Sequence, residues 1–322
     1  MMQGRLGFFK GLRWLWWGML WCSLPAGAEV RAVASIKPLH SLVAGVMQGV
    51  AAPELLVRGG ASPHDYNLRP SEMRALAEAR VVFWIGPELE AFMVKPVSNV
   101  KARVRSVALL DAPGMTVLPL RAGGAWEKHD HGREPAEGDH AGRDHGGGKG
   151  DRDAHVWLDP DNAIAMVPRI VAALGEVDRE HQADYERNGA RLIERLRDLD
   201  RQLAAELAPV QDRPYIVFHD AYQYFERRYG LNAVGSVVLN PEQRPGARRV
   251  TEIQSRIRDS KARCVFSEPQ FQPALVETVT AGGTARRGVL DPLGADLAAG
   301  PDAYFQLLRG LSAGLRACLG ED

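Results

Sequence analysis

The chain has 322 residues, of which 45% are hydrophobic and 25% charged, so it can bury a large core and is expected to form two lobes. Its 40 basic and 40 acidic residues give a formal net charge of zero. Three of the basic residues lie in the first 28 positions, which leaves 37 basic against 40 acidic residues in the remainder. This balance provides no basic face for a nucleic acid.

The first 28 residues have the pattern of a secretory signal. The segment begins with a basic region that contains Arg5, Lys10 and Arg13, and a short tryptophan-rich apolar run follows. Ala26 to Ala28 then supplies the small residues that a cleavage site needs. We therefore expect a signal peptide over residues 1–28 and a protein exported to the periplasm. The alternative is an uncleaved membrane anchor, for which the apolar run is short. After cleavage only Cys264 and Cys318 remain, and an oxidising compartment favours a disulfide over two buried thiols.

Residues 29–178 are predicted to form an N-terminal α/β lobe. Strands are expected at 30–36, 54–58 and 81–85, and helices at 38–48, 72–79 and 88–93, with Ser71 as an N-cap. Strands that alternate with helices at this spacing predict βα units and a parallel sheet.

A polar stretch at 123–153 interrupts this lobe. It carries His129, His131, His140 and His145 among aspartates and glycines, and it has no helical or strand period. Too few apolar side chains are present to offset the entropy of ordering, so we expect a mobile surface loop. Imidazoles interleaved with carboxylates make a loose metal collector, best suited to zinc. The alternative is a solvated linker that happens to contain histidine.

A long helix is predicted after the loop, within a connecting segment at 179–210. Leucines repeat along it at helical spacing, opposite a charged face, and some 25 residues would measure about 37 Å. A helix at 163–177 precedes it. Residues 211–322 then restart the alternation as a C-terminal α/β lobe, with strands at 215–218, 233–239, 263–266 and 288–290 and helices at 221–229, 247–259 and 302–319.

Four polar residues are predicted at the carboxyl ends of strands, where ligands bind in parallel α/β sheets. They are His64, His155 beside a short strand at 156–158, His219 and Asp291. Two belong to each lobe, so they can meet only in the cleft between the lobes. Three neutral imidazoles plus a carboxylate or water complete a tetrahedral zinc shell.

The chain resembles a known family at these residues. The segments ASPHDY (61–66), HVWLDP (155–160), FHDAY (218–222) and LDPLG (290–294) look like signatures of the periplasmic zinc-binding proteins of ABC uptake systems, within the cluster A-I metal-binding superfamily. The match runs from about residue 30 to 319. It implies two α/β lobes joined by one rigid helix, Zn²⁺ in the interlobe cleft, and delivery to a membrane permease.

The resemblance also implies residue roles. His64, His155 and His219 match the metal ligands, Asp291 is a candidate fourth, and Cys264–Cys318 matches a disulfide seen in part of the family. Manganese and iron binders of the same superfamily usually place a carboxylate at the third position, so His219 favours zinc. Some zinc members have Glu before the first ligand, where this chain has Pro63, which leaves the fourth position between Asp291 and water.

Two other classes of protein share some of these features. A secreted zinc hydrolase also needs three histidines and an open position, but no HExxH motif is present and Glu268 is the only candidate base nearby. A surface adhesin would need a lipid-anchoring cysteine, which the signal segment lacks because Trp21 precedes Cys22. We therefore expect a monomeric carrier of Zn²⁺ without enzymatic activity.

Overall fold

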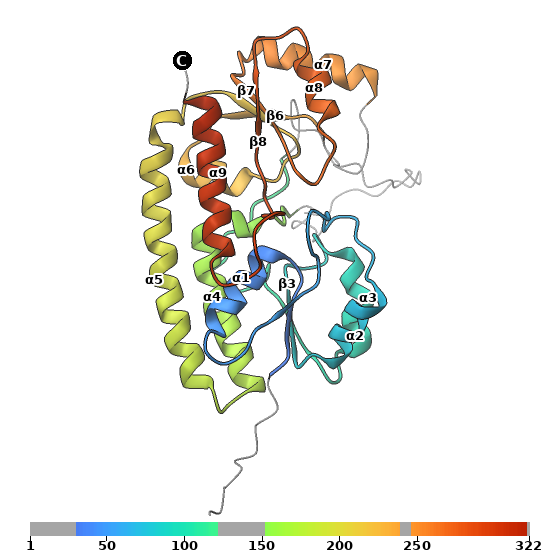
Figure 1. The fold of residues 1–322 in the computed structure, drawn as a ribbon, viewed down its shortest axis with the longest axis vertical. Coiled ribbons are helices and arrows are strands. Elements are labelled where there is room, and N and C mark those ends of the chain that lie inside the picture. Colours follow the sequence, from blue (N-terminus) through green and yellow to red (C-terminus); the bar gives the residue numbers. More distant parts are fainter. Residues whose placement is uncertain (1–29, 122–151, 239–245, 321–322) are drawn as a thin grey trace, which may run out of the picture.

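The computed structural model describes residues 30–121, 152–238 and 246–320, which form two α/β lobes (Figure 1). The predicted signal peptide and the histidines at positions 129, 131, 140 and 145 lie outside the described residues. Within the described part of the chain, none of the helices combines the length and apolar character needed to cross a membrane.

The first lobe contains a four-stranded parallel sheet in the order β2-β1-β3-β4. Its central strands, rich in β-branched and aromatic residues, are fully buried, as expected for a parallel sheet covered on both faces. The strands are β1 (Ala32–Ala34), β2 (Glu54–Leu55), β3 (Val81–Trp84) and β4 (Arg105–Ala108), and the helices between them are α1 (Lys37–Val46), α2 (Pro70–Glu78) and α3 (Val94–Val100). Because β1 pairs with both β2 and β3, the sheet has its topological switch point between β1 and β3.

The second lobe repeats this arrangement with the strand order β6-β5-β7-β8, again all parallel. The strands are β5 (Tyr215–Val217), β6 (Ala233–Ser236), β7 (Cys264–Ser267) and β8 (Arg286–Val289), and the helices are α6 (Gln223–Tyr229), α7 (Ala247–Asp259), α8 (Ala274–Thr280) and α9 (Ala303–Leu319). A disulfide between Cys264 and Cys318 ties β7 to α9. The switch point lies between β5 and β7, so side chains just after these two strands face the same crevice.

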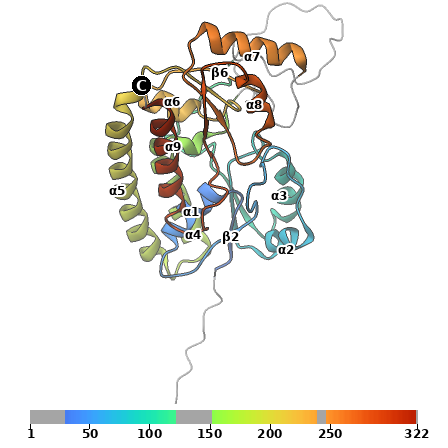
Figure 2. The ribbon, with the colours of Figure 1, turned by 45° about the horizontal axis from the view of Figure 1, so that its top comes forward.

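A layer of helices joins the two lobes. It consists of α4 (Pro160–Val177) and α5 (Gln182–Leu207) with α1 and α9, and α5 packs against the other three. Figures 1 and 2 both show α5 along the flank of the two lobes, beside α9. Its buried stripe includes five leucines at helical spacing: Leu192, Leu196, Leu199, Leu203 and Leu207. The packing of α5 against α1, α4 and α9 therefore connects the two lobes rigidly.

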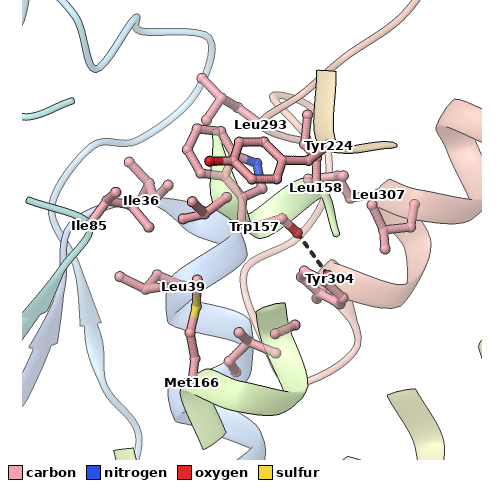
Figure 3. Close-up of a cluster of buried hydrophobic side chains, with 14 of the residues drawn as sticks. Ile36, Leu39, Ile85, Trp157, Leu158, Met166, Tyr224, Leu293, Tyr304 and Leu307 are labelled. Atoms are coloured by element: carbon pink, nitrogen blue, oxygen red, sulfur yellow. Dashed lines mark hydrogen bonds between the residues drawn. The ribbon is translucent and has the colours of Figure 1, made fainter. Parts of the chain in front are cut away.

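One hydrophobic core runs through the junction of the lobes (Figure 3). The buried Trp157 lies at its centre: its Nε1 donates to Pro292 O at 2.8 Å, and its own carbonyl accepts from Tyr304 Oη at 2.8 Å. Lys37, at the start of α1, adds hydrogen bonds to three carbonyls of the C-terminal lobe, those of Gly294, Ala295 and Leu297. Such a shared core limits how far the lobes can separate.

The structure corrects several predicted elements. Residues 156–158 form a 3₁₀ helix that leads into α4, whereas we expected a strand. The helix expected at 88–93 is a 3₁₀ turn at Ala91–Met93 followed by α3. Ser71 is not an N-cap, because α2 begins one residue earlier at Pro70, whose missing N–H and fixed φ suit the first helical turn. The sequence did not indicate β4 or α8.

Candidate metal centre

Three of the predicted site residues meet between the lobes. His64 comes from the loop between β2 and α2, His155 directly precedes the 3₁₀ helix Val156–Leu158, and His219 follows β5. The Nε2 atoms of His64 and His155 lie 3.2 Å apart, and those of His155 and His219 lie 3.4 Å apart. All three ligand atoms lie within 4.8 Å of one another. The structure thus brings together side chains that are 91 and 64 residues apart in the sequence.

These separations have the size that a zinc ion requires. A zinc–imidazole bond of 2.0–2.1 Å and a tetrahedral angle place two ligand nitrogens about 3.3 Å apart. The two measured Nε2–Nε2 distances, 3.2 and 3.4 Å, lie on either side of that value. A neutral imidazole carries one N–H, so a ring that donates from Nδ1 has only a lone pair on Nε2, and two such rings, here His155 and His219, cannot share a hydrogen bond through their Nε2 atoms. An ion at the centre of the three nitrogens resolves this conflict.

Buried carboxylates orient two of the three imidazoles. His155 Nδ1 lies 2.8 Å from Asp153 Oδ1, which also accepts from the backbone N–H of His155 at 3.0 Å. His219 Nδ1 lies 2.7 Å from Glu268 Oε1. An ionised carboxylate can only accept, so each ring donates from Nδ1 and directs the lone pair of Nε2 into the site. Asp153 and Glu268 are only 1% and 2% exposed.

The charge of Glu268 also affects protonation of the site. Burial lowers the pKa of His219, but the attraction of Glu268 and the hydrogen bond to it outweigh burial, so the pKa of His219 is raised. Protons therefore compete with a metal ion for this imidazole. Neither carboxylate was assigned this role from the sequence, in which Glu268 was considered only as a base. Asp153 had a local signal, since it lies two residues before His155, whereas Glu268 is 49 residues from its partner.

The histidines line a small cavity of about 10 Å³, enough for a single water-sized particle. Its other walls are formed by Ser62, Pro63, Trp157, Glu268, Gln270, Phe271, Pro292 and Leu293. Most of these side chains are apolar, so an ion in this cavity would be largely shielded from bulk water.

Asp291 does not join the histidine group. Its Oδ1 accepts from the backbone N–H groups of Leu293 at 3.0 Å and Gly294 at 2.9 Å, and its Oδ2 accepts from Ala295 N. The side chain of Gln270 donates to Oδ1 as well, at 2.7 Å. The carboxylate therefore caps its own turn, in which Gly294 has a φ of 68° that favours glycine. This hydrogen bonding explains why the candidate fourth ligand is missing from the cluster.

The cluster stands alone among the residues that the structure describes: no other group of three or more histidine, cysteine or carboxylate side chains could hold a metal there. The remaining described histidines have local partners. His40 Nε2 lies 3.0 Å from Pro53 O, and His181 Nδ1 lies 2.9 Å from Asp178 Oδ2. They serve the packing of α1 and the start of α5.

Comparison with known proteins places the chain among zinc-uptake components. The family model described as "Zinc-uptake complex component A periplasmic" matches residues 32–318. The high-affinity zinc uptake system protein ZnuA of Brucella suis biovar 1 (strain 1330) is 48% identical over 316 residues, covering 92% of this chain and 93% of the relative. The protein of the same name from Yersinia pestis is 37% identical over 300 residues, covering 91% and 92%. A solved structure described as the crystal structure of ZnuA superposes with a TM-score of 0.72 at 23% identity, covering 90% of this chain and 99% of that chain. Because the identity to this solved structure is only 23%, its similarity supports the fold of the chain alone.

Proposed function

The chain belongs to the family of periplasmic zinc-uptake complex component A, and from this premise we propose that it captures Zn²⁺ in the periplasm and delivers it to the permease of an ABC-type importer. His64, His155 and His219 hold the ion through their Nε2 atoms. The protein acts as a carrier and catalyses no reaction, and zinc is its cargo.

The spacing of the three Nε2 atoms is the observation that carries this proposal. Distances of 3.2 and 3.4 Å correspond to two edges of a zinc tetrahedron. Asp153 and Glu268 hold two of the rings in the tautomer that binds metal, so little reorganisation accompanies capture. A site prepared in this way favours tight binding.

Zinc is favoured over manganese and iron by the ligand chemistry. Imidazole suits the borderline ion Zn²⁺, whereas Mn²⁺ prefers carboxylate and water oxygens. The carboxylates of Asp153, Glu268 and Asp291 each accept hydrogen bonds from an imidazole or from backbone amides. The relatives named as high-affinity zinc uptake proteins agree with this preference.

The hydrolase alternative is disfavoured by the size of the cavity. Catalytic zinc sites keep a position open for the substrate, but here the space beside the histidines measures only about 10 Å³. Glu268, the base considered from the sequence, is 2% exposed and accepts from His219.

Delivery requires that the ion leave a buried site while the lobes remain braced. Because α5 packs against α1, α4 and α9, we expect small local movements of the cavity wall to open the site. The predicted export signal over residues 1–28 supports a location in the compartment that the outer face of a permease meets. For the histidine-rich stretch at 123–153 we propose an accessory role, either raising the local concentration of Zn²⁺ or reporting excess metal.

Metal titration of single-histidine variants tests the ligand assignment. His64→Ala, His155→Ala and His219→Ala should each lower zinc affinity by more than tenfold in competition with a chromophoric chelator. His181→Ala is the matched control, because His181 also pairs with a carboxylate but lies at the start of α5. If His219→Ala binds zinc as tightly as His181→Ala does, the proposed site is wrong.

A further inference from the structure

One segment of the C-terminal lobe forms part of the wall of the metal cavity and also reaches a groove at the surface. Pro292 and Leu293 line the cavity beside the three histidines. Ala295 and Leu297, a few residues later, line a groove of about 570 Å³ to which both lobes contribute residues. We call residues 292–297 the wall segment. Because it borders the cavity, its position decides how well the cavity is closed.

Lys37 binds the wall segment from the N-terminal lobe. Its ammonium group donates to the carbonyl oxygens of Gly294, Ala295 and Leu297, at 2.7 Å for Ala295 and 2.8 Å for Leu297. An ammonium group has three N–H donors, and these three carbonyls use all of them. Hydrogen bonds from a charged donor are stronger than those between neutral groups. Lys37 is only 6% exposed, so water competes weakly for its donors.

The amide groups of the same segment are bound by its own lobe. Asp291 accepts from the backbone N–H groups of Leu293 and Gly294, at 3.0 and 2.9 Å. The carboxylate of Asp291 thus binds backbone N–H groups, whereas the ammonium group of Lys37 binds backbone carbonyls of neighbouring residues. Removal of the Lys37 side chain would therefore leave the turn itself intact but weaken its attachment to the N-terminal lobe.

Lys37 is itself firmly placed. It is the first residue of α1, a helix that is buried along its whole length and packs against α4, α5 and α9. The carboxylates of Asp291 and Asp296 lie close enough to attract its charge. The wall segment is therefore attached to one of the most rigid parts of the molecule, the helical layer that joins the lobes.

We propose that Lys37 is a positioning residue that keeps the wall segment closed over the metal cavity and so sets the rate at which zinc enters and leaves. The inference rests on the proposed function, since it takes zinc at the three histidines as given. The wall segment also meets the loop that carries His64, because a Cβ atom added at Gly60 would lie 3.8 Å from the Cβ atom of Ala295. An outward movement of the segment would therefore open the cavity without separating the lobes.

Stopped-flow kinetics of Lys37→Met test this proposal, because methionine keeps an apolar chain of similar length but has no donor. Zinc dissociation, followed by transfer to an excess of a chromophoric chelator, should be at least about tenfold faster than in the wild type, the effect of losing one hydrogen bond to a charged group. Association should be faster as well, so the equilibrium affinity should change less than the dissociation rate. The Co²⁺ absorption spectrum should match that of the wild type, because the three histidines are unchanged.

Ser41→Ala is the matched control. Ser41 Oγ accepts from Tyr304 N at 2.9 Å, so this variant also removes a buried hydrogen bond between α1 and the C-terminal lobe, but at the start of α9. It should bind and release zinc at wild-type rates. Lys37→Gln retains an amide donor and is the second variant if Lys37→Met does not fold. It should accelerate both rates to a smaller extent.

The possible contrary results are distinct. Zinc dissociation at the wild-type rate from a folded Lys37→Met or Lys37→Gln protein would overturn the role of Lys37. Equal acceleration in Ser41→Ala would overturn it too, because the effect would then reflect a general loosening between the lobes. A changed Co²⁺ spectrum in Lys37→Met would mean that the ligands themselves have moved, which contradicts a role confined to the wall. The proposed function fails separately, if the unmodified protein binds no zinc tightly or if the histidine variants still do.

Discussion

Asp153→Asn isolates the contribution of a carboxylate that never touches the metal. In the wild type, Asp153 Oδ1 accepts from both the Nδ1 and the backbone nitrogen of His155, at 2.8 and 3.0 Å. The substitution keeps the size of the side chain and one acceptor oxygen but removes the negative charge. The ring of His155 loses the negative charge beside its Nδ1, and because an asparagine side chain can donate as well as accept, the tautomer of the ring is less firmly fixed.

The expected loss is a 10–100-fold drop in zinc affinity, as is typical when such a supporting carboxylate is changed. In free energy this corresponds to about 1.4–2.8 kcal/mol, since each tenfold step is worth about 1.4 kcal/mol. We expect the loss of binding free energy to lie toward the upper end of this range, because Asp153 is 1% exposed and water therefore screens its charge little. The number of bound zinc ions should stay at one.

Competition between the protein and a chromophoric chelator measures this loss, with Asp178→Asn as the control. Asp178 likewise accepts from a histidine, His181 Nδ1 at 2.9 Å, but at the start of α5. Both variants should unfold cooperatively, so that a weak affinity in one of them is not due to misfolding. Equal zinc affinities for the two variants would refute the reasoning that Asp153 acts through His155.

Three further predictions concern stability. Replacing Cys264 and Cys318 with serine opens a loop with a sequence separation of 54 and should lower the free energy of unfolding by about 4 kcal/mol on the chain-entropy model. Urea unfolding of the oxidised wild type and of the variant measures this loss, and a difference under about 1 kcal/mol would contradict the prediction. Burial raises the pKa of Glu90 to about 7 from 4.5. The folded state therefore binds the proton more tightly, and the associated stability, present below pH 4.5, is lost as the pH rises to about 7. Between pH 5 and pH 8 the wild type should therefore lose a free energy of unfolding on the order of 3 kcal/mol, measured by urea unfolding, and Glu90→Gln should remove this loss. An equal change in unfolding free energy for both proteins between the two pH values would count against the prediction. Zinc at 1,000 times its dissociation constant should stabilise the wild type by about 4 kcal/mol, whereas chelation should abolish the increase in Tm, and an equal increase in His64→Ala would contradict the site.

The sequence indicated elements whose residues repeat strongly. The leucine stripe predicted a helix within 179–210, and α5 occupies Gln182–Leu207. The sequence did not predict β4, because this strand lies at the edge of the sheet and begins with the polar residues Arg105 and Ser106, so it lacks an apolar strand pattern. The Val-Trp-Leu run at 156–158 was wrongly read as a strand, since three apolar residues carry no periodicity that separates strand from helix. Asp159 ends this 3₁₀ helix and is the N-cap of α4, where its side chain accepts from Asp161 N.

The candidate site divides in the same way. Each of the three histidines was found from its own neighbours along the chain, and topology explains why they converge. The supporting layer depends on contacts between distant segments, such as Glu268 with His219 and Gln270 with Asp291. Asp291 was predicted beside the metal because it follows a strand, but the backbone amides of its own turn compete for the carboxylate. The sequence around Asp291 does not indicate whether its carboxylate binds a metal ion or accepts from the backbone N–H groups of its own turn.

The most direct test of the zinc site is a competitive titration with Zn²⁺ and Mn²⁺ of the mature protein and of a variant lacking residues 124–150. The deletion is feasible because two described residues that flank the segment, Leu118 and Asp153, are joined by a hydrogen bond from Asp153 N to Leu118 O at 2.8 Å. We predict one tight zinc equivalent in both proteins, with manganese unable to displace it. Loss of tight zinc binding in the shortened protein would contradict the account, because it would place the metal on the histidines of the deleted segment.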